Sequence, residues 1–529
     1  MRIKINIRLM TILLNTLLFL LLFGSVFMFG LFTDEYILPK WLFSIVFSIL
    51  FLISFPFCRF KRKNMALLQN TINNALTVII ALLLVLCVGA FFINGYHFCE
   101  SPFVTFDNTA GVASCFCIAL PFLLFSKPES YTVKKILLPL TGAVLCLLRS
   151  KTGILCFLVI IAIYYLHCRK NWEKGDRVRY VVIITLASLC FIAMLYFSPD
   201  STRGRFFILL NTITMLTGYP FGLGIGGFRR EYMNYQADFF RNNPDSSFSM
   251  LADNVRTPLN DYLLCFVDFG IVGLIAVILL FALVIYLYRH SWSDKRMVYL
   301  STLISIAVFA ALSYPFSYPF TWLMLVACIL ALCVHSDSVY VNKAIACLSR
   351  LMNKKLIVLP VTILLIALLG LVVRRGYYEQ LLKVYDSDRA ALNDSQVKSL
   401  DSYFADSPRF LSVRALMCYE SGQYEEALSY LKQSSSHWAD YDVVLYEGMS
   451  LMKLGKNKSA VEKFGEALYM CPNRFYPLYY QMKIFLKVHD NAAAKKIAGK
   501  ILRKPVKVYS QDVMMIRHEA RIILGGAQS

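Results

Sequence analysis

Eleven apolar runs occupy most of the first 375 residues of this 529-residue sequence, and they restrict what the chain can fold into. A helix needs roughly 20 mostly apolar residues to cross the hydrocarbon core of a bilayer. Several runs reach that length, and the shorter ones would cross with tilt or thin flanks. Hydrophobic residues make up 58% of the chain and charged residues 16%, which excludes a soluble globule. We therefore predict an all-α, polytopic membrane domain over residues 1–375 with 11 spans. The runs lie near 9–32, 41–58, 75–94, 110–126, 135–148, 153–168, 180–198, 262–288, 298–315, 319–335 and 356–374.

The lysines and arginines between these runs predict the orientation of the chain. With the N-terminus in the cytoplasm, each inner loop carries three to five basic residues, whereas the three short outer loops carry only Lys40. Cytoplasmic loops of membrane proteins are enriched in such residues. The net charge of +21 is therefore interpreted as a topology signal and not as a nucleic-acid-binding surface. The same alternation places residues 197–260 and everything after residue 375 on the outer side.

The outer segment at residues 197–260, which we call the arginine loop, contains six arginines and no lysine, although lysine is common elsewhere in the chain. Guanidinium is planar, permanently charged and able to bind two phosphate oxygens at once. Excess positive charge is not the default outside, so this set indicates a site for a diphosphate or another polyanion. The alternative is a structured loop whose arginines pair with its own carboxylates, which are fewer than the arginines. The six are Arg203, Arg205, Arg229, Arg230, Arg241 and Arg256.

Further candidates lie beside and inside the arginine loop. The turn RSKTG holds Arg149 and Lys151 at an outer position, where cations at membrane depth are costly unless paired. They either snorkel to the headgroups or contact the same anion. Asp268 lies about two turns into an apolar run, where an ionisable group is a functional candidate unless it reaches the interface. The glycine-rich segment 218–228 would let the backbone approach a ligand or a neighbouring helix closely.

Four segments resemble landmarks of one family. FDNTAG at 106–111 is similar to an outer-loop F-D-N-P-x-G motif, and RSKTG is similar to an S-R-T/G turn, with Lys151 where arginine is usual. The stretch from STRGRFF to GYPFGLGIGGF is similar to G-R…P-x-G-x-G-x-x-F, and TPLNDYLLCFVDFGIVG is similar to H-x-x-N-x-Y-L…E-x-G-x-x-G. In this order, over most of residues 85–290, they resemble the O-antigen ligase and O-antigen polymerase family of bacterial inner-membrane glycosyltransferases. The matches in the third segment are Arg205, Pro220, Gly222 and Gly224.

The resemblance implies a GT-C-like helical membrane fold and transfer of a glycan from a polyprenyl diphosphate carrier to an acceptor hydroxyl. It also implies a multi-pass inner-membrane location, with the arginine loop and the tail in the periplasm. Negative charge grows on the lipid diphosphate as the glycosidic bond breaks, and fixed arginines can neutralise it without a metal or a cofactor. We therefore predict Arg205, Asn260 and Asp261 as catalytic residues. The predicted substrate-binding residues are Arg203, Arg229, Arg230, Arg149, Lys151, Asp107, Asn108 and Tyr232.

The general base is the role that the sequence leaves open. Where the family usually has a histidine, this chain has Thr257 or, in a shifted alignment, Leu259. Asp261, Asp253 or His97 would have to remove the proton of the acceptor hydroxyl instead. The alternatives are a reduced or different activity, or a non-catalytic protein that binds lipid-linked glycan.

Residues 376–529 change to a soluble, amphipathic composition with an internal repeat. The segments SGQYEEAL and LGKNKSAV are spaced by 33 residues, and Ala494 continues the register. A period near 34 with small residues at helix crossings is typical of tetratricopeptide hairpins. We predict about three such units as an α-solenoid outside the membrane, after a linker helix near 377–393. The aligned pairs are Gly422 with Gly455 and Ala427 with Ala460.

The acceptor stays open at this point. A ligase would attach the glycan to a lipid A core sugar, a polymerase to the next glycan repeat, and a protein O-glycosyltransferase to a protein presented by the tail. The expected partners are the polyprenyl diphosphate-linked donor, one of these acceptors, membrane lipid and a protein bound by the repeats, with no nucleic acid. A structural cap over the catalytic mouth is the alternative role for the repeats.

Overall fold

The computed structural model of this protein describes residues 7–55, 62–93, 103–125, 131–168, 174–197, 199–293, 295–352, 355–388 and 391–525. The chain forms two compact units: residues 1–197 with 277–392 make the first, and residues 198–276 with 393–529 make the second. Within the described ranges the β-structure amounts to two isolated bridges. The prediction of an all-α protein is therefore confirmed.

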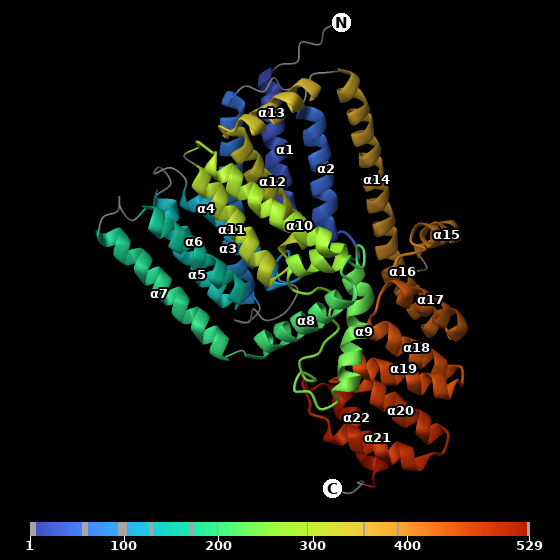
Figure 1. Cartoon of the computed structure of the whole chain (residues 1–529). Helices are drawn as coiled ribbons and strands as arrows, with labels where there is room; N and C mark the ends of the chain where they lie inside the picture. Colours follow the sequence, from blue (N-terminus) through green and yellow to red (C-terminus); the bar gives the residue numbers. More distant parts are fainter. Residues whose placement is uncertain are drawn as a thin grey trace. The chain divides into compact units, whose positions relative to one another are not determined.

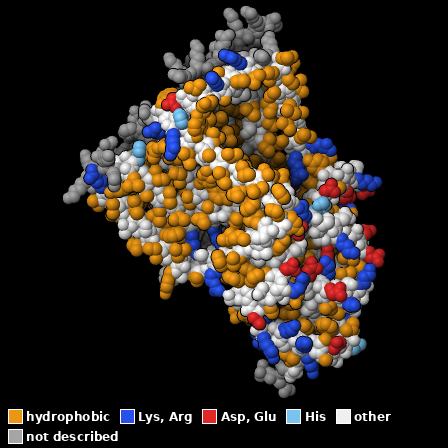
Figure 2. Space-filling model, in the orientation of Figure 1, with side chains coloured by type: hydrophobic (Ala, Val, Ile, Leu, Met, Phe, Trp, Pro, Cys, Tyr) orange, Lys and Arg blue, Asp and Glu red, His pale blue; other side chains and the backbone are white. Residues whose placement is uncertain are grey.

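Apolar helices build the first unit (Figure 1). Each apolar run predicted from the sequence overlaps one helix, and α10 (Asp261–Arg289) contributes residues to both units. Figure 2 shows hydrophobic side chains predominating over the helices of this unit, while acidic and basic side chains gather over the C-terminal helices. The other helices of the first unit are α1 (Ile7–Phe27), α2 (Leu38–Ser54), α3 (Arg62–Ile93), α4 (Thr109–Leu124), α5 (Tyr131–Leu147), α6 (Lys151–Cys168), α7 (Lys174–Phe197), α11 (Arg296–Leu312), α12 (Pro319–Val334), α13 (Val339–Met352) and α14 (Lys355–Ser387).

Several helices qualify as membrane spans by length and composition. Among the described residues, α1, α3, α6, α10 and α14 contain such stretches, and a sixth span results if α7 and α8 (Pro199–Gly218) form one bent pair. Five shorter apolar helices of 10–17 residues lie in α2, α4, α5, α11 and α12. The structure thus supports a membrane protein with several spans, while the number 11 and the orientation remain predictions.

Helix α4 lies at the centre of the first unit. Fourteen of its 16 residues are buried. Its sequence, TAGVASCFCIALPFLL, carries no charge and is apolar on every face, which is the pattern of a helix surrounded by others. It packs against α3, α6, α11 and α12. Asn108 starts the helix by accepting a hydrogen bond from the Gly111 amide at 2.8 Å.

The second unit combines the arginine loop with the C-terminal tail. The loop contributes α8, α9 (Gly227–Asn242) and the first part of α10. The tail contributes α15 (Asp394–Tyr403), α16 (Pro408–Glu420), α17 (Tyr424–His437), α18 (Tyr441–Lys453), α19 (Asn457–Met470), α20 (Tyr476–Lys487), α21 (Asn491–Arg503) and α22 (Gln511–Ile523).

The tail helices from α16 to α21 form three successive hairpins with the predicted period. The second residue after the first helix of each hairpin has a positive φ. Its amide donates to the carbonyl three residues earlier, and the next amide donates to the carbonyl five residues earlier, which is the Schellman pattern. The three alanines that the sequence aligns are all fully buried. A helical repeat is therefore present, and its assignment to the tetratricopeptide class remains a prediction. The three turn residues are Gly422 (78°), Gly455 (75°) and His489 (59°).

The linker helix predicted near 377–393 is not a separate element. Helix α14 runs from Lys355 to Ser387 as one helix, because nothing after its apolar part breaks the helical pattern. The following helix, α15, begins at a capping box in which Asn393 and Gln396 exchange hydrogen bonds. The domain limits 1–375 and 376–529 remain a proposal.

The arginine loop and the repeats share a hydrophobic core within the second unit. Phe228, Tyr232 and Met233 of α9 pack in one cluster with Phe464 and Met470 of α19. Hydrogen bonds from buried polar side chains reinforce this packing. The Gln236 side-chain amide donates to the Met470 carbonyl at 2.6 Å and to the Asp253 carbonyl at 3.0 Å. The Asn473 side-chain amide donates to the Ala252 carbonyl at 2.6 Å. The loop is therefore folded onto the tail and is not a free connection.

Candidate functional site

The glycine-rich segment packs against a break in α10. Gly270 adopts φ 58° and ψ −144°, which interrupts the helix and leaves preceding carbonyls without helical partners. The Leu223 amide donates to the Val267 carbonyl at 2.8 Å, and the Gly224 amide donates to the Asp268 carbonyl at 2.9 Å. The segment thereby supplies the hydrogen bonds that the helix lacks.

Glycine is needed on both sides of this contact. A Cβ on Gly270 would lie 2.2 Å from the carbonyl carbon of Phe221. A Cβ on Gly222 would lie 2.6 Å from the carbonyl oxygen of Asp268. Because real Cβ atoms do not approach backbone so closely, any other residue would displace one of the two segments. For Gly222 the prediction of a close backbone approach is confirmed, and the neighbour is α10, whereas a Cβ on Gly224 would meet nothing within 4 Å.

Asp268 lies where the glycine-rich segment leads into α9. Its Oδ2 accepts a hydrogen bond from the Gly226 amide at 3.4 Å, and its carboxylate also faces the Gly227 and Phe228 amides. The first amides of a helix lack internal partners and carry partial positive charge. Asp268 therefore caps α9 and fixes the direction in which the helix leaves the segment.

Helix α8 carries Arg203 and Arg205, and both side chains are exposed. Arg203 lies 3.9 Å from the Asp200 carboxylate and donates to the Ser247 hydroxyl at 3.2 Å. Phe207 anchors the helix, because its buried ring stacks on Phe248 with centroids 5.0 Å apart. The two guanidinium groups are thus presented from a helix whose position in the unit is fixed by packing.

Arg229 and Arg230 lie in the first turn of α9. Arg229 is exposed, and its Nε donates to the Arg256 carbonyl at 3.3 Å. Arg230 is half-buried, donates to the Leu223 carbonyl, and lies 3.7 Å from the Glu231 carboxylate. The pair therefore ties the start of α9 to the glycine-rich segment and to residue 256.

At least four of the six arginines lie within 4.0 Å of a carboxylate. The pairs of Arg203 and Arg230 described above are long, at 3.9 and 3.7 Å, and Arg256 lies 3.5 Å from the Asp440 carboxylate. The expectation that acidic partners would be too few for the arginines is therefore only partly met. That expectation considered only the carboxylates of the loop, and Asp440, which pairs with Arg256, belongs to the tail.

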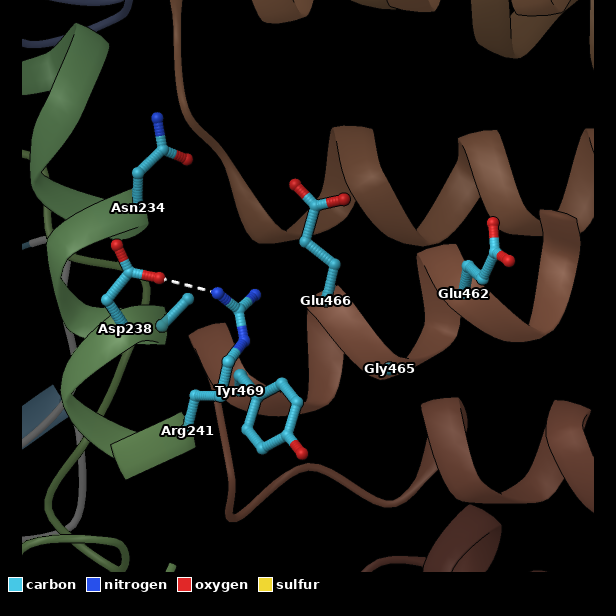
Figure 3. Close-up of a pocket in the computed structure, with 8 residues that line it drawn as sticks. Asn234, Asp238, Arg241, Glu462, Gly465, Glu466 and Tyr469 are labelled. Atoms are coloured by element: carbon cyan, nitrogen blue, oxygen red, sulfur yellow. Dashed lines mark hydrogen bonds and ion pairs between the residues drawn. The ribbon is translucent and has the colours of Figure 1, made fainter. Parts of the chain in front are cut away.

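Arg241 lies in a different environment, shown in Figure 3. It pairs with Asp238 at 2.7 Å and lies over the ring of Tyr469 at 5.4 Å from the centroid. These residues line a cleft of about 410 Å³ between α9 and α19 that also contains Glu462 and Glu466. Three carboxylates against one guanidinium make this cleft unfavourable for a diphosphate. Arg241 is therefore the least suited of the six to a phosphate site.

Asn260 and Asp261 lie where the arginine loop enters α10. The Asn260 side-chain oxygen accepts hydrogen bonds from the Tyr262 and Leu263 amides, both at 3.0 Å. This is the geometry of an N-cap, and Asp261 is the first residue of the helix. The preceding residue, Leu259, has a φ of 54°, which an L-residue adopts only at a cost. The structure gives Asn260 a capping role, and its predicted catalytic role remains a proposal.

The structure does not fit the prediction that Tyr232 contacts substrate. The residue is fully buried, and its ring stacks on Phe228 with centroids 4.6 Å apart in the core shared with the repeats. Helical periodicity could have indicated that Tyr232 is buried, because it follows Phe228 by four residues and so lies on the same face of α9. We therefore exclude Tyr232 from the candidate site.

The candidate bases differ in their surroundings. Burial opposes ionisation of Asp253, but the Asn254 amide and the Arg474 guanidinium at 2.9 Å outweigh it and lower the pKa of Asp253. A carboxylate with a lowered pKa is a poor proton acceptor, so Asp253 is the weaker candidate. His97 lies outside the described residues. Asp261 remains the candidate base within the second unit.

The predicted residues Asp107 and Asn108 belong to a polar network in the first unit. Tyr318 donates a hydrogen bond to Asp107, and the Asn108 amide donates to the hydroxyls of Tyr314 and Tyr318. Lys40 is fully buried close to this network, where its Nζ donates to the Thr105 carbonyl and lies 4.7 Å from the centroid of the Phe106 ring. The sequence reasoning missed both tyrosines. The sequence could have indicated a special role for Lys40, because it is the one basic residue of the three short outer loops near 33–40, 95–108 and 314–318.

Arg149 and Lys151 lie at the turn between α5 and α6. Arg149 is exposed with a φ of 51°, and Lys151 is half-buried in the first turn of α6. Ser150 between them caps α6 by accepting from the Gly153 amide at 3.1 Å. Both cations belong to the first unit and the loop arginines to the second, so their contact with one shared anion remains a prediction.

One comparison with known proteins identifies this region. Residues 136–278 match the family model described as O-antigen ligase. Over these 143 of its 529 residues the chain is therefore similar to the O-antigen ligase family. No curated protein matches the chain.

The region that matches the ligase family can be located in this structure. It contains the turn with Arg149 and Lys151, helices α8 and α9, the glycine-rich segment and the break at Gly270. It ends within α10 and includes neither the network around Asp107 nor the repeats. The O-antigen ligase domain and the tail are thus separate in sequence, although the loop of the ligase domain is packed against the tail.

Proposed function

We propose that this protein transfers a glycan from a polyprenyl diphosphate carrier to an acceptor hydroxyl, as an O-antigen ligase does. The observation that carries the proposal is the family match over residues 136–278, which contains all six loop arginines and the turn with Arg149 and Lys151. The apolar helices support a membrane location, and the charge pattern favours the outer face of the bacterial inner membrane.

The arginine loop would bind the diphosphate of the donor. Arg205 and Arg203 on α8, with Arg229 on α9, present exposed guanidinium groups from helices that packing holds in place. Preorganised charge of this kind stabilises a leaving diphosphate more as negative charge grows on it. Arg230 would hold the glycine-rich segment, and Arg149 with Lys151 would assist if they reach the same anion.

The charge balance of the reaction assigns the remaining roles. The bond between the anomeric carbon and the diphosphate oxygen breaks, the diphosphate leaves with the electron pair, and the acceptor oxygen bonds to the anomeric carbon. The acceptor proton must go to a base, and Asp261 at the start of α10 is the candidate. The proposal gives neutralisation of the leaving diphosphate to the arginines.

The substitution Arg205→Ala tests this assignment, and Arg241→Ala is its matched control. Both remove an exposed arginine from the same loop, but only Arg241 lies in the carboxylate-lined cleft. In a deletion strain that carries each variant, we expect Arg205→Ala to abolish attachment of long surface glycan and Arg241→Ala to retain it. Normal attachment with Arg205→Ala, at an unchanged protein level in the membrane, would reject the role of Arg205.

The same strain identifies the acceptor. Loss of all long chains from lipid A with accumulation of lipid-linked chains indicates a ligase, and a single repeat unit left on the core indicates a polymerase. Unchanged lipopolysaccharide with loss of glycan from glycoproteins indicates a protein O-glycosyltransferase. The ligase outcome is the one that the family match favours.

A further inference from the structure

One turn of the tail contacts two arginines of the ligase loop. This turn, Trp438–Asp440, connects α17 to α18. The Ala439 amide donates to the Arg229 carbonyl at 3.1 Å. The Asp440 carboxylate lies 3.5 Å from the Arg256 guanidinium, and the Trp438 ring lies under the same guanidinium at 4.9 Å from its centroid. Backbone and side chains of one short turn thus contact both residues.

Asp440 is built into this contact from several sides. Its side chain is 4% exposed, so its charge requires partners. Oδ2 accepts from the Asn254 side-chain amide at 3.0 Å and faces Arg256, while Oδ1 accepts from the Asp442 amide at 2.9 Å. The last bond caps α18, so the carboxylate is held rigidly by the repeat. A rigid carboxylate restrains the guanidinium that it faces.

The restraint extends to the start of α9. The Arg256 carbonyl accepts from Arg229 Nε at 3.3 Å, so residues 229 and 256 are joined to each other as well as to the turn. Asn254 also accepts from the Tyr441 amide at 3.4 Å through its side-chain oxygen. The loop segment 254–256 is therefore hydrogen-bonded both to α9, through Arg229, and to the turn and the start of α18, through Asp440 and Tyr441.

We propose that the turn Trp438–Asp440 positions the arginines of the ligase loop, and that Asp440 is a positioning residue for glycan transfer. The repeat domain is then a structural part of the transferase and not only a module that recruits a partner. This inference rests on the proposed function for its catalytic consequence. Its structural part concerns the loop alone and can be measured without substrate.

The substitution Asp440→Asn removes the contacts of Oδ2 and keeps the contact of Oδ1. Asparagine caps helices as well as aspartate does, so the cap of α18 is retained, while the ion pair with Arg256 and the hydrogen bond from the Asn254 amide are lost. The matched control is Asp490→Asn, because Asp490 caps α21 in the same domain by accepting from the Ala493 amide at 2.9 Å. Both substitutions remove one negative charge from a capping position, and only the first concerns the loop.

Hydrogen exchange of the full-length protein in detergent measures the positioning directly. In Asp440→Asn we expect amides of residues 229–231 and 254–257 to exchange about tenfold faster, the effect of one lost charge-assisted contact. Asp490→Asn should leave them unchanged, and both variants should keep the protection of α18. Unchanged exchange at 254–257 in Asp440→Asn would overturn the proposal.

Transfer kinetics test the catalytic consequence. We expect Asp440→Asn to lower kcat/KM for the lipid-linked donor about tenfold, and the double variant with Arg256→Gln to lose little more, because both act through one contact. Faster exchange with unchanged kinetics would contradict a role in positioning. If the wild-type protein transfers no glycan, the proposed function fails, and the exchange experiment alone decides whether the turn holds the loop.

Discussion

The contact between the glycine-rich segment and α10 can be tested with two glycines that differ in one respect. Gly222 and Gly224 both have positive φ, 86° and 79°. An alanine Cβ at 222 would lie 2.6 Å from the Asp268 oxygen and the Gly270 nitrogen, whereas a Cβ at 224 would meet nothing within 4 Å. The substitutions Gly222→Ala and Gly224→Ala therefore share the cost of the left-handed conformation, and only the first also creates a backbone clash.

The structure sets the size of the difference. Each alanine costs roughly 1–2 kcal/mol for its conformation. At 222 the segment must also move away from α10, which breaks three backbone hydrogen bonds of 2.8, 2.9 and 2.9 Å, the third being from the Ile271 amide to the Pro220 carbonyl. At roughly 1 kcal/mol each these add about 3 kcal/mol, which corresponds to a change in the local opening equilibrium on the order of a hundredfold.

Hydrogen exchange at Leu223 and Ile271 reads this equilibrium. In Gly222→Ala these amides should exchange on the order of a hundredfold faster than in Gly224→Ala. The loss of this contact should also lower glycan transfer, because the segment leads directly into the arginines of α9. Equal exchange in the two variants would refute the reasoning, since it would show that the close approach adds nothing beyond the φ cost.

Two further predictions concern the tail. The substitution His489→Gly should raise the free energy of unfolding by about 1 kcal/mol, because His489 adopts the left-handed conformation that glycine occupies in the two preceding repeats, and no rise in Tm would contradict this. The pair Asp253–Arg474 should stabilise the second unit above the unfolded pKa of aspartate, about 3.9, and lose its effect as pH falls, because the pKa of Asp253 is lowered in the folded state. Both side chains are more than half exposed, so screening by solvent limits the contribution of the pair to a few tenths of a kcal/mol. When the pH falls from 6 to 3, the Tm of Arg474→Gln should therefore decrease by about one degree less than the Tm of the wild-type protein.

The sequence predicted the helices well because their signals are local. Apolar runs and the 33-residue repeat need no knowledge of distant contacts, and both appear as helices at the expected places. The capping role of Asn108 and Asn260 was also available, since asparagine before an apolar helix is a known N-cap signal. Asn108 was instead predicted to bind substrate and Asn260 to be catalytic, although each begins a helix in the structure.

The rest depends on contacts between segments far apart in the chain. Asp440 lies 184 residues after Arg256, so no pattern in the loop could show that the tail supplies its carboxylate. The break at Gly270 explains the glycines near 222, but the two segments are 48 residues apart. The burial of Tyr232 follows from a core that the repeats complete. The ion pair of Arg256 and the burial of Tyr232 arise because the loop folds on the tail, and the contact at Gly270 arises because the loop folds back on α10.

Purified protein with a polyprenyl diphosphate-linked glycan and an acceptor gives the most direct test of the central claim. The account predicts that the wild-type protein attaches the glycan and releases the lipid diphosphate, and that Arg205→Ala binds the donor more weakly and shows no turnover. Donor binding without turnover by the wild-type protein would contradict it, as would equal turnover by Arg205→Ala.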